Sequence, residues 1–229
     1  MNADISGSQN QDFRTISRKL PKNAECFVLD MGCGNGLYSS EIATGGTRVF
    51  GIDLLKESLL IARKNEPSKC VTWICADIRH LPFRNEIFGL VLSVEVLTHL
   101  PLEERREVFF EMARVGKEGA NVYLTLHNRR QLDFRAWLLR QDIREVYETN
   151  NLPVWPTDEV SMRKLARDCG FTTSAPIAYL NYYSRFSTDF VCRFPVLSKG
   201  LALFEDLISK IPVIRRLSIT LYLQLKKLR

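Results

Sequence analysis

The first 128 residues alternate short apolar segments with helical patterns, and this alternation restricts the fold more than any other feature of the chain. Strands are predicted over residues 26–31, 48–53, 70–76, 88–93 and 121–126, and helices over residues 37–44, 56–65 and 103–115. Strands at this spacing with helices between them form right-handed βαβ units around a parallel sheet. Because these strands are strongly apolar, we expect an α/β, doubly wound sheet with helices on both faces.

The pattern changes after residue 128. We predict an Arg-rich amphipathic helix over 128–148, a loop with two prolines over 151–156, and a helix over 158–168. Thr157 is its expected N-cap, and Gly170 follows its end. A strand over 171–181, a helix over 197–211 and a last strand over 218–225 complete the prediction.

The composition is that of a globular protein, with 45% hydrophobic and 25% charged residues among 229. The first residues lack the basic and apolar regions of a signal peptide, and the longest apolar run, near 88–100, is too short to span a bilayer. The six cysteines form no C-x-x-C pair, so we expect neither a metal site nor disulfides. We interpret them as buried, reduced thiols in a cytoplasmic protein.

A glycine-rich turn follows the first predicted strand, in the segment Asp-Met-Gly-Cys-Gly-Asn-Gly that begins at Asp30. Glycines allow a sharp turn and let a ligand approach the backbone. The amides at the start of the following helix, near Leu37 and Tyr38, then face a negatively charged group. By itself such a loop is a weak signal.

Two further acids stand at the ends of the next strands. Asp53 ends the second strand and is positioned to accept hydrogen bonds from ribose hydroxyls. Asp77 follows the third strand and is positioned to accept from an adenine amine, while Leu54 and Ile78 are candidates to pack on the ring. Each acid alone is also explained as a turn or capping residue. Together with the loop they predict a nucleoside-binding crevice.

A nicotinamide dinucleotide site is the nearest alternative. Its fingerprint, Gly-x-Gly-x-x-Gly, requires a third glycine where this chain has Leu37, and here an acid, Asp30, precedes the loop. Both features favour S-adenosyl-L-methionine, whose methionine carboxylate would meet the helix amides. The predicted cofactor-binding residues are Asp30, Gly32, Cys33, Gly34, Gly36, Asp53, Leu54, Asp77, Ile78 and Ser93, without a metal.

Residues 26–128 resemble the core of class I, Rossmann-like methyltransferases, in the broad type 11 group that includes quinone- and lipid-methylating enzymes. Segments 28–36, 51–53, 75–78 and 88–100 are similar to its first four motifs, and 111–119 to the helix and turn before the fifth strand. The resemblance implies a seven-stranded, mostly parallel sheet whose last strand is antiparallel, with helical insertions after strands 5 and 6. Gly89 departs from the usual Asp and is expected to loosen the entry of the fourth strand, and Glu118 replaces a usual proline in a turn.

This organisation divides the chain at residue 25. Residues 1–24 are expected to be a partly disordered segment with a short helix, and 25–229 a single domain. Within the domain, 25–128 would form the cofactor-binding core and 129–229 would complete the sheet and cover the acceptor side.

Methyl transfer needs a base only for a poorly acidic hydroxyl or a protonated amine. His99 is the first candidate and His127 the second, although each is also explained as a structural histidine. Glu95 is expected either to line the cofactor pocket or to cap a helix. Aromatic residues after position 128 are candidates for the acceptor pocket or for core packing: Phe134, Trp137, Trp155, Tyr179, Tyr182, Tyr183 and Phe186.

The charge is uneven along the chain. Residues 1–128 hold 15 basic and 16 acidic side chains, and residues 129–229 hold 17 and 10, so the net charge of +6 comes from the second part. We expect a small-molecule or lipid-like acceptor, with RNA as the alternative partner and a peripheral contact with an anionic membrane as a further one. A solvated basic surface explains the same charges, no DNA partner is expected, and the oligomeric state is not predicted. A non-catalytic, cofactor-binding partner subunit is the third hypothesis.

Overall fold

The structure, a computed structural model, describes residues 26–43, 46–66, 69–130, 147–149, 152–173, 177–179 and 220–228. The predicted helix over 197–211 and the N-terminal segment lie outside these residues, as does Cys192. Among the described residues, no helix is long and apolar enough to cross a membrane. The same residues contain no group of three His, Cys, Asp or Glu side chains able to hold a metal ion.

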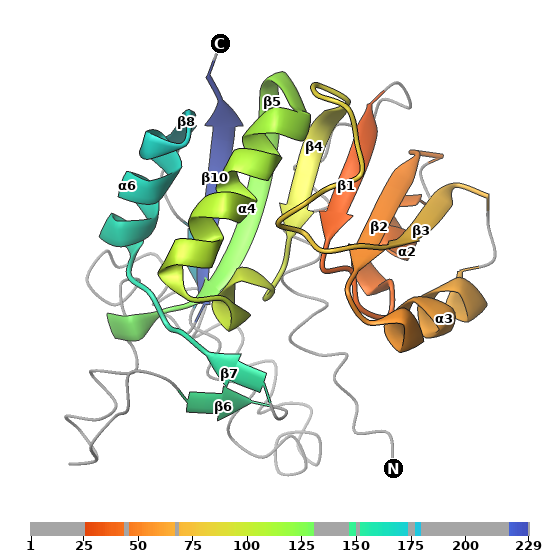
Figure 1. Cartoon of the computed structure of the whole chain (residues 1–229), viewed down its shortest axis with the longest axis horizontal. Helices are drawn as coiled ribbons and strands as arrows, with labels where there is room; N and C mark the ends of the chain where they lie inside the picture. Colours follow the sequence, from red (N-terminus) through yellow and green to blue (C-terminus); the bar gives the residue numbers. More distant parts are fainter. Residues whose placement is uncertain are drawn as a thin grey trace, which may run out of the picture.

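The central sheet has the strand order β3-β2-β1-β4-β5-β10-β8 (Figure 1). Its parallel strands are β1 (Phe27–Met31), β2 (Val49–Asp53), β3 (Val71–Cys75), β4 (Phe88–Ser93) and β5 (Gly116–His127). Strand β10 (Thr220–Lys227) is antiparallel to β5. The outer edge of β10 pairs with β8 (Phe171–Thr173) near its end and with β9 (Ile177–Tyr179) near its start.

Strands β8 and β9 therefore share one position at the edge of the sheet. This gives seven strand positions, in which only β10 runs opposite to the other strands, and it confirms the predicted fold class. The single strand predicted over 171–181 is divided into these two short strands.

Helices cover both faces of the sheet (Figure 1). They are α2 (Leu37–Ala43), α3 (Lys56–Asn65), α4 (Leu102–Val115) and α6 (Glu159–Asp168), and a short 3-10 helix, η1 (Leu97–His99), follows β4. Side chains of β4 alternate between the faces, because Val91 packs in the core under α4 and α6 while Leu90 and Leu92 pack in the core beside α2. Apolar side chains thus pack on both faces of the sheet.

The end of the predicted helix over 128–148 and the start of the predicted loop were wrong, while residues 131–146 of that helix lie outside the described residues. Glu148 lies in strand β6 (Tyr147–Thr149), which pairs antiparallel with β7 (Leu152–Val154), so the helix does not reach 148 and the expected loop begins as a strand. The register pairs Thr149 with Leu152, and the intervening Asn-Asn sequence is typical of tight hairpin turns. Backbone pairing with β7 thus determines the structure of residues 147–149.

The N-cap of α6 was also predicted one residue too early. The Asp158 carboxylate accepts hydrogen bonds from the amides of Val160 at 2.8 Å and Ser161 at 3.0 Å, so Asp158 is the cap. Thr157 instead forms a parallel bridge with Asn128, beside the end of β5, and its amide donates to the His127 carbonyl at 3.0 Å. Gly170 follows the helix with φ of 87°, as its position in the sequence predicts.

Of the described cysteines, Cys33 and Cys169 are buried and Cys26 and Cys70 are half-buried. Cys75 is exposed, so the prediction of buried thiols was wrong there. The reason is its position: Cys75 is the last residue of β3, the edge strand of the sheet, where little packs on the outward side chain.

Candidate functional site

The glycine loop between β1 and α2 has the geometry that its sequence predicts. Gly32, Gly34 and Gly36 all have positive φ angles, of 73°, 52° and 83°, which L side chains adopt only with strain. A Cβ atom on Gly32 would lie 2.3 Å from Val96, and one on Gly36 would lie 2.5 Å from Trp73. Nothing lies within 4 Å of the corresponding position on Gly34. Packing therefore requires the outer two glycines, while the middle one borders open space.

Asp53 fixes this loop to the end of β2. One carboxylate oxygen accepts the Gly34 amide at 2.8 Å, and the other accepts the Leu55 amide at 2.8 Å. The amides of Gly32 and Cys33 add bonds to the Ile52 carbonyl, at 2.7 and 2.8 Å. Because a carboxylate oxygen accepts two hydrogen bonds, each oxygen of Asp53 keeps capacity for a ligand hydroxyl.

Asp30 lies beneath the loop rather than on its open side. It is 2% exposed, and one of its carboxylate oxygens accepts the Ser39 hydroxyl of α2 at 2.7 Å. Burial raises the pKa of Asp30 to about 6, against the hydrogen bond from Ser39 and with a further contribution from the charge of Asp53. Burial also raises the pKa of the Cys33 thiol, so that this loop cysteine stays protonated.

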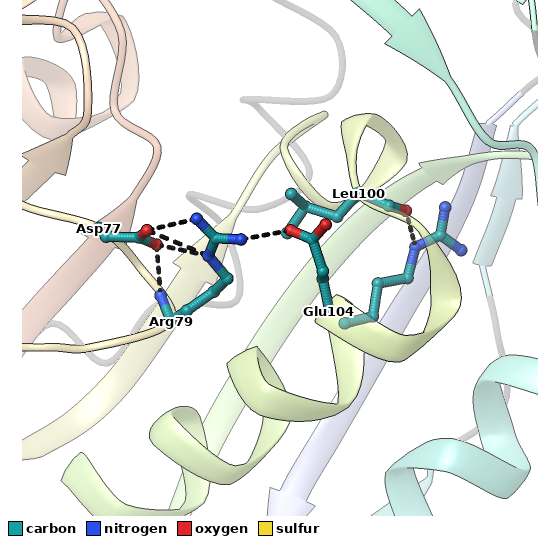
Figure 2. A network of polar contacts seen from close by, with 5 residues as sticks. Asp77, Arg79, Leu100 and Glu104 are labelled. Carbon is teal, nitrogen blue, oxygen red and sulfur yellow. Dashed lines mark hydrogen bonds and ion pairs between the residues drawn. The ribbon is translucent and has the colours of Figure 1, made fainter.

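Asp77 is held by Arg79, a residue that the sequence prediction did not include (Figure 2). The Arg79 backbone amide donates to the Asp77 carboxylate at 2.9 Å, and its guanidinium forms a fork with N–O distances between 2.6 and 3.1 Å. The hydrogen bond from Arg79 lowers the pKa of Asp77. The guanidinium also donates to Glu104 of α4 at 2.6 Å, which ties the loop after β3 to that helix.

Three other predicted cofactor contacts differ in their access to solvent. Leu54 is 65% exposed beside Asp53 and offers a free apolar surface. Ile78 is 9% exposed and packs in the core under α4. Ser93 is wholly buried, and its hydroxyl has no hydrogen-bond partner among the described residues.

The two candidate histidines have different partners. Nδ1 of His99 lies 2.9 Å from the Pro153 carbonyl oxygen, and a carbonyl only accepts, so Nδ1 carries the proton. In the neutral ring Nε2 is then unprotonated. Nε2 of His127 instead lies 2.8 Å from the Glu95 carboxylate, to which it donates. Of the two rings, His99 has the tautomer of a general base at Nε2.

Glu95 neither caps a helix nor adopts an ordinary backbone conformation. Its φ is 59°, and its amide donates to the Thr125 hydroxyl at 2.8 Å. Val96 is the N-cap residue of η1 and makes no side-chain capping bond, so the expected capping role of Glu95 was wrong. Strained non-glycine residues occur at ligand-binding edges, and this one directs its carboxylate to His127.

The packing around Gly89 explains why this position has glycine and not the Asp that is usual in the family pattern. A Cβ there would lie 2.2 Å from the Cys26 sulfur, so any side chain would displace Cys26. The register of β4 shifts at this residue, since Phe88 pairs with Phe27 but Leu90 pairs with Val28. The entry of β4, where loosening was expected, therefore has an irregular register.

A pocket of about 310 Å³ lies away from these residues, near the starts of β4 and β5. Its walls include Glu86, Gly170 and Lys227 and none of the predicted site residues. The predicted crevice is at the opposite edge of the sheet, where β1 and β2 end. The glycine loop, Asp53 and both candidate histidines follow strands that end at that edge. The aromatic candidates for the acceptor pocket, apart from the backbone of Tyr179 and from Trp155, lie outside the described residues.

Comparison with known proteins agrees with this geometry. Residues 29–124 match the family model described as a methyltransferase domain. A ubiquinone biosynthesis O-methyltransferase from Idiomarina loihiensis is 32% identical over 115 residues, which cover 49% of this chain and 45% of that protein. The chain thus matches about half the length of this curated relative.

Solved structures share the fold over nearly the whole chain. An S-adenosylmethionine dependent methyltransferase from Mesorhizobium loti has a TM-score of 0.68 at 14% identity, covering 97% of this chain and 99% of that one. Magnesium protoporphyrin IX methyltransferase from Synechocystis, with bound SAH, has a TM-score of 0.65 at 15% identity, covering 99% and 90%. At these identities the likeness shows the fold.

Proposed function

We propose that this chain, whose residues 29–124 match the model of a methyltransferase domain, transfers a methyl group from S-adenosyl-L-methionine to a hydroxyl of a small-molecule or lipid-like acceptor. The observation that carries this proposal is the glycine loop held by Asp53, with open space at Gly34 and acceptor capacity left on both carboxylate oxygens.

The residues at this edge fit the proposed cofactor. The amides at the start of α2 would meet its carboxylate, Asp53 would accept from its ribose, and the exposed Leu54 would pack on its base. Asp77 already accepts several bonds from Arg79, so an adenine amine shares it with that guanidinium. Asp30, Cys33, Ile78 and Ser93 are buried and support the crevice from behind. When bound, S-adenosylmethionine supplies an electrophilic methyl group on a sulfonium.

His99 would act as the general base for the methyl acceptor. Its Nε2 is unprotonated in the tautomer fixed by Pro153, which suits removal of a hydroxyl proton. The relatedness of residues in this region to an O-methyltransferase supports a hydroxyl acceptor. Correct placement of the two reactants supplies most of the acceleration in such displacements, up to roughly 7–11 kcal/mol in favourable models.

The test is methyl transfer from labelled S-adenosylmethionine to cell extract separated into RNA, protein, lipid and small molecules. We expect label in the lipid or small-molecule fraction. Label in RNA would replace this acceptor class by the RNA alternative, which the basic residues after 128 suggest. No label in any fraction, from protein that binds the cofactor, would favour the non-catalytic partner subunit.

One variant removes the basic nitrogen of His99 while it keeps the hydrogen bond that His99 makes within the fold. His99→Asn keeps a donor close to the position of Nδ1 and so retains the bond to Pro153, but it lacks Nε2. We expect kcat to fall by about 100-fold or more, with little change in cofactor affinity. Unchanged kcat would remove His99 from the mechanism.

A further inference from the structure

Arg105 is a buried arginine whose described partners include no carboxylate. It stands in the first turns of α4, is 2% exposed, and burial lowers its pKa to about 10, which leaves it charged at neutral pH. Its Nε donates to the carbonyls of Leu97 and Leu100, each at 2.8 Å. Its Nη2 donates to the carbonyl of Trp155, and Nη1 lies 3.8 Å from the Met162 sulfur. Burying a charge without a carboxylate partner is costly, and the hydrogen bonds to three carbonyls offset part of that cost.

The three carbonyls belong to two segments that meet at His99. Leu97 and Leu100 bracket η1, the turn that carries this histidine. Trp155 lies two residues after Pro153, whose carbonyl accepts a hydrogen bond from Nδ1 of His99 at 2.9 Å. The Trp155 amide also donates to the Thr98 carbonyl at 2.8 Å. One guanidinium therefore holds both the ring's segment and the segment of its hydrogen-bond acceptor.

Glu104, the residue before Arg105 on α4, bonds to the network around Asp77. Glu104 accepts from Arg79, which in turn holds Asp77, while the Leu100 carbonyl lies at the start of the same helix (Figure 2). The first turns of α4 thus connect the loop after β3 with the turn after β4. Arg105 bonds to the turn after β4 and to the Trp155 carbonyl. None of its bonds reaches Asp77 or Arg79.

We infer that Arg105 is a positioning residue that keeps His99 in the Nδ1–H tautomer, so that Nε2 is free to take the acceptor's proton. This inference rests on the proposed function. In the step it serves, the acceptor oxygen bonds to the methyl carbon as its proton passes to Nε2. The carbon–sulfur bond breaks, its electron pair stays on sulfur, and the imidazolium later releases the proton to water. A planar cation with several donors is needed, because an ammonium at this point cannot reach carbonyls in both segments with the same geometry.

The experiment compares Arg105→Met and Arg105→Lys with Arg106→Met, an exposed neighbour on the same helix, as control. The readout is the ¹⁵N chemical shifts of the imidazole nitrogens at a pH where the rings are neutral. The chain has three histidines, so His80→Gln, His99→Asn and His127→Gln assign the signals. Because this readout needs neither cofactor nor turnover, it gives a result whether or not the protein methylates anything.

We expect the unmodified protein and Arg106→Met to show His99 with the proton on Nδ1. Arg105→Met should show a mixture of tautomers and a kcat lower by about 10–100-fold, as for other outer partners that orient a histidine ring, with the KM for cofactor unchanged. Arg105→Lys should recover part of the Nδ1–H tautomer and part of kcat. If circular dichroism shows that Arg105→Met is unfolded, the test uses Arg105→Lys. A proton on Nε2 in the unmodified protein would overturn the inference, as would an unchanged tautomer in the folded variants. Absence of methyl transfer with the expected tautomer would instead refute the proposed function.

Discussion

At the scale of single residues, the glycine loop offers a comparison inside the same chain. Gly34 and Gly46 both have positive φ, of 52° and 78°, and neither has any atom within 4 Å of an added Cβ. Alanine at either position therefore carries a similar backbone strain, of about 1–2 kcal/mol, without a steric clash. The two residues differ in location, because only Gly34 lies in the loop held by Asp53.

We expect Gly34→Ala and Gly46→Ala to lower the free energy of unfolding by similar amounts in urea titrations. Only Gly34→Ala should weaken the binding of S-adenosylhomocysteine, by about tenfold or more, which corresponds to at least about 1.4 kcal/mol. The reason is that its new methyl group stands where the ligand approaches the backbone. Equal affinities in the two variants would exclude Gly34 from the cofactor site.

Asp30 gives a prediction about pH. Its folded-state pKa of about 6 lies above the ordinary value of 3.8, so the fold favours the neutral acid. The resulting stabilisation is complete below about pH 4 and is lost as the pH rises through 6. Asp30→Asn has no such titration. Relative to the unmodified protein, the variant should gain up to about 3 kcal/mol of unfolding free energy between pH 4 and pH 7.

Urea unfolding of both proteins at pH 4, 5.5 and 7 measures this difference. A difference that stays constant across the range would contradict a buried, neutral-favouring Asp30. The comparison uses the change with pH, because the absolute cost of placing an amide beside Ser39 cancels from it.

At the scale of elements, the regular helices and strands of the first 128 residues follow from their apolar periodicity. The helix over 56–65 and the strand over 88–93 have the predicted ends, while β5 begins at Gly116 rather than at 121. The extra residues are exposed or glycine-rich, and they join the strand because Phe88 of β4 pairs with Gly116. Residues that join a strand because a neighbouring strand pairs with them are hard to predict from their own composition.

The start of α6 allows a direct test of such an element boundary. Asp158→Ala should destabilise the protein by about 1 kcal/mol, because the amides of Val160 and Ser161 lose their acceptor. Thr157→Ala should cost less, since the hydrogen bonds of Thr157 at the end of β5 are made by its backbone. Thermal unfolding of the two variants checks the order, and the reverse order would restore Thr157 as the cap.

At the scale of the whole molecule, the sequence predicts the sheet and the position of the site, because both depend on local patterns. The glycine loop, Asp53 and the antiparallel last strand are found where they were expected. The side-chain partners are not predictable in this way. Arg79 and Arg105 bond across the fold to residues up to 50 positions away, such as Trp155, and one-dimensional periodicity carries no information about such contacts. The Asp-x-Arg spacing at Asp77 is the one local signal that was available for either arginine.

The hairpin of β6 and β7 shows the same limit on a larger scale. Its residues were predicted as the end of a helix and a loop. In the structure the Pro153 carbonyl is the hydrogen-bond acceptor for His99, and the carbonyl of Trp155, just after β7, is a hydrogen-bond acceptor for Arg105. The surroundings of His99 are thus assembled from segments more than 50 residues apart.

Calorimetric titration of the unmodified protein with S-adenosylhomocysteine tests the central claim most directly. We predict one site per chain with a dissociation constant in the micromolar range, roughly −8 kcal/mol, and a large loss of affinity in Asp53→Ala. No heat of binding at millimolar ligand, from protein that circular dichroism shows to be folded, would contradict the account.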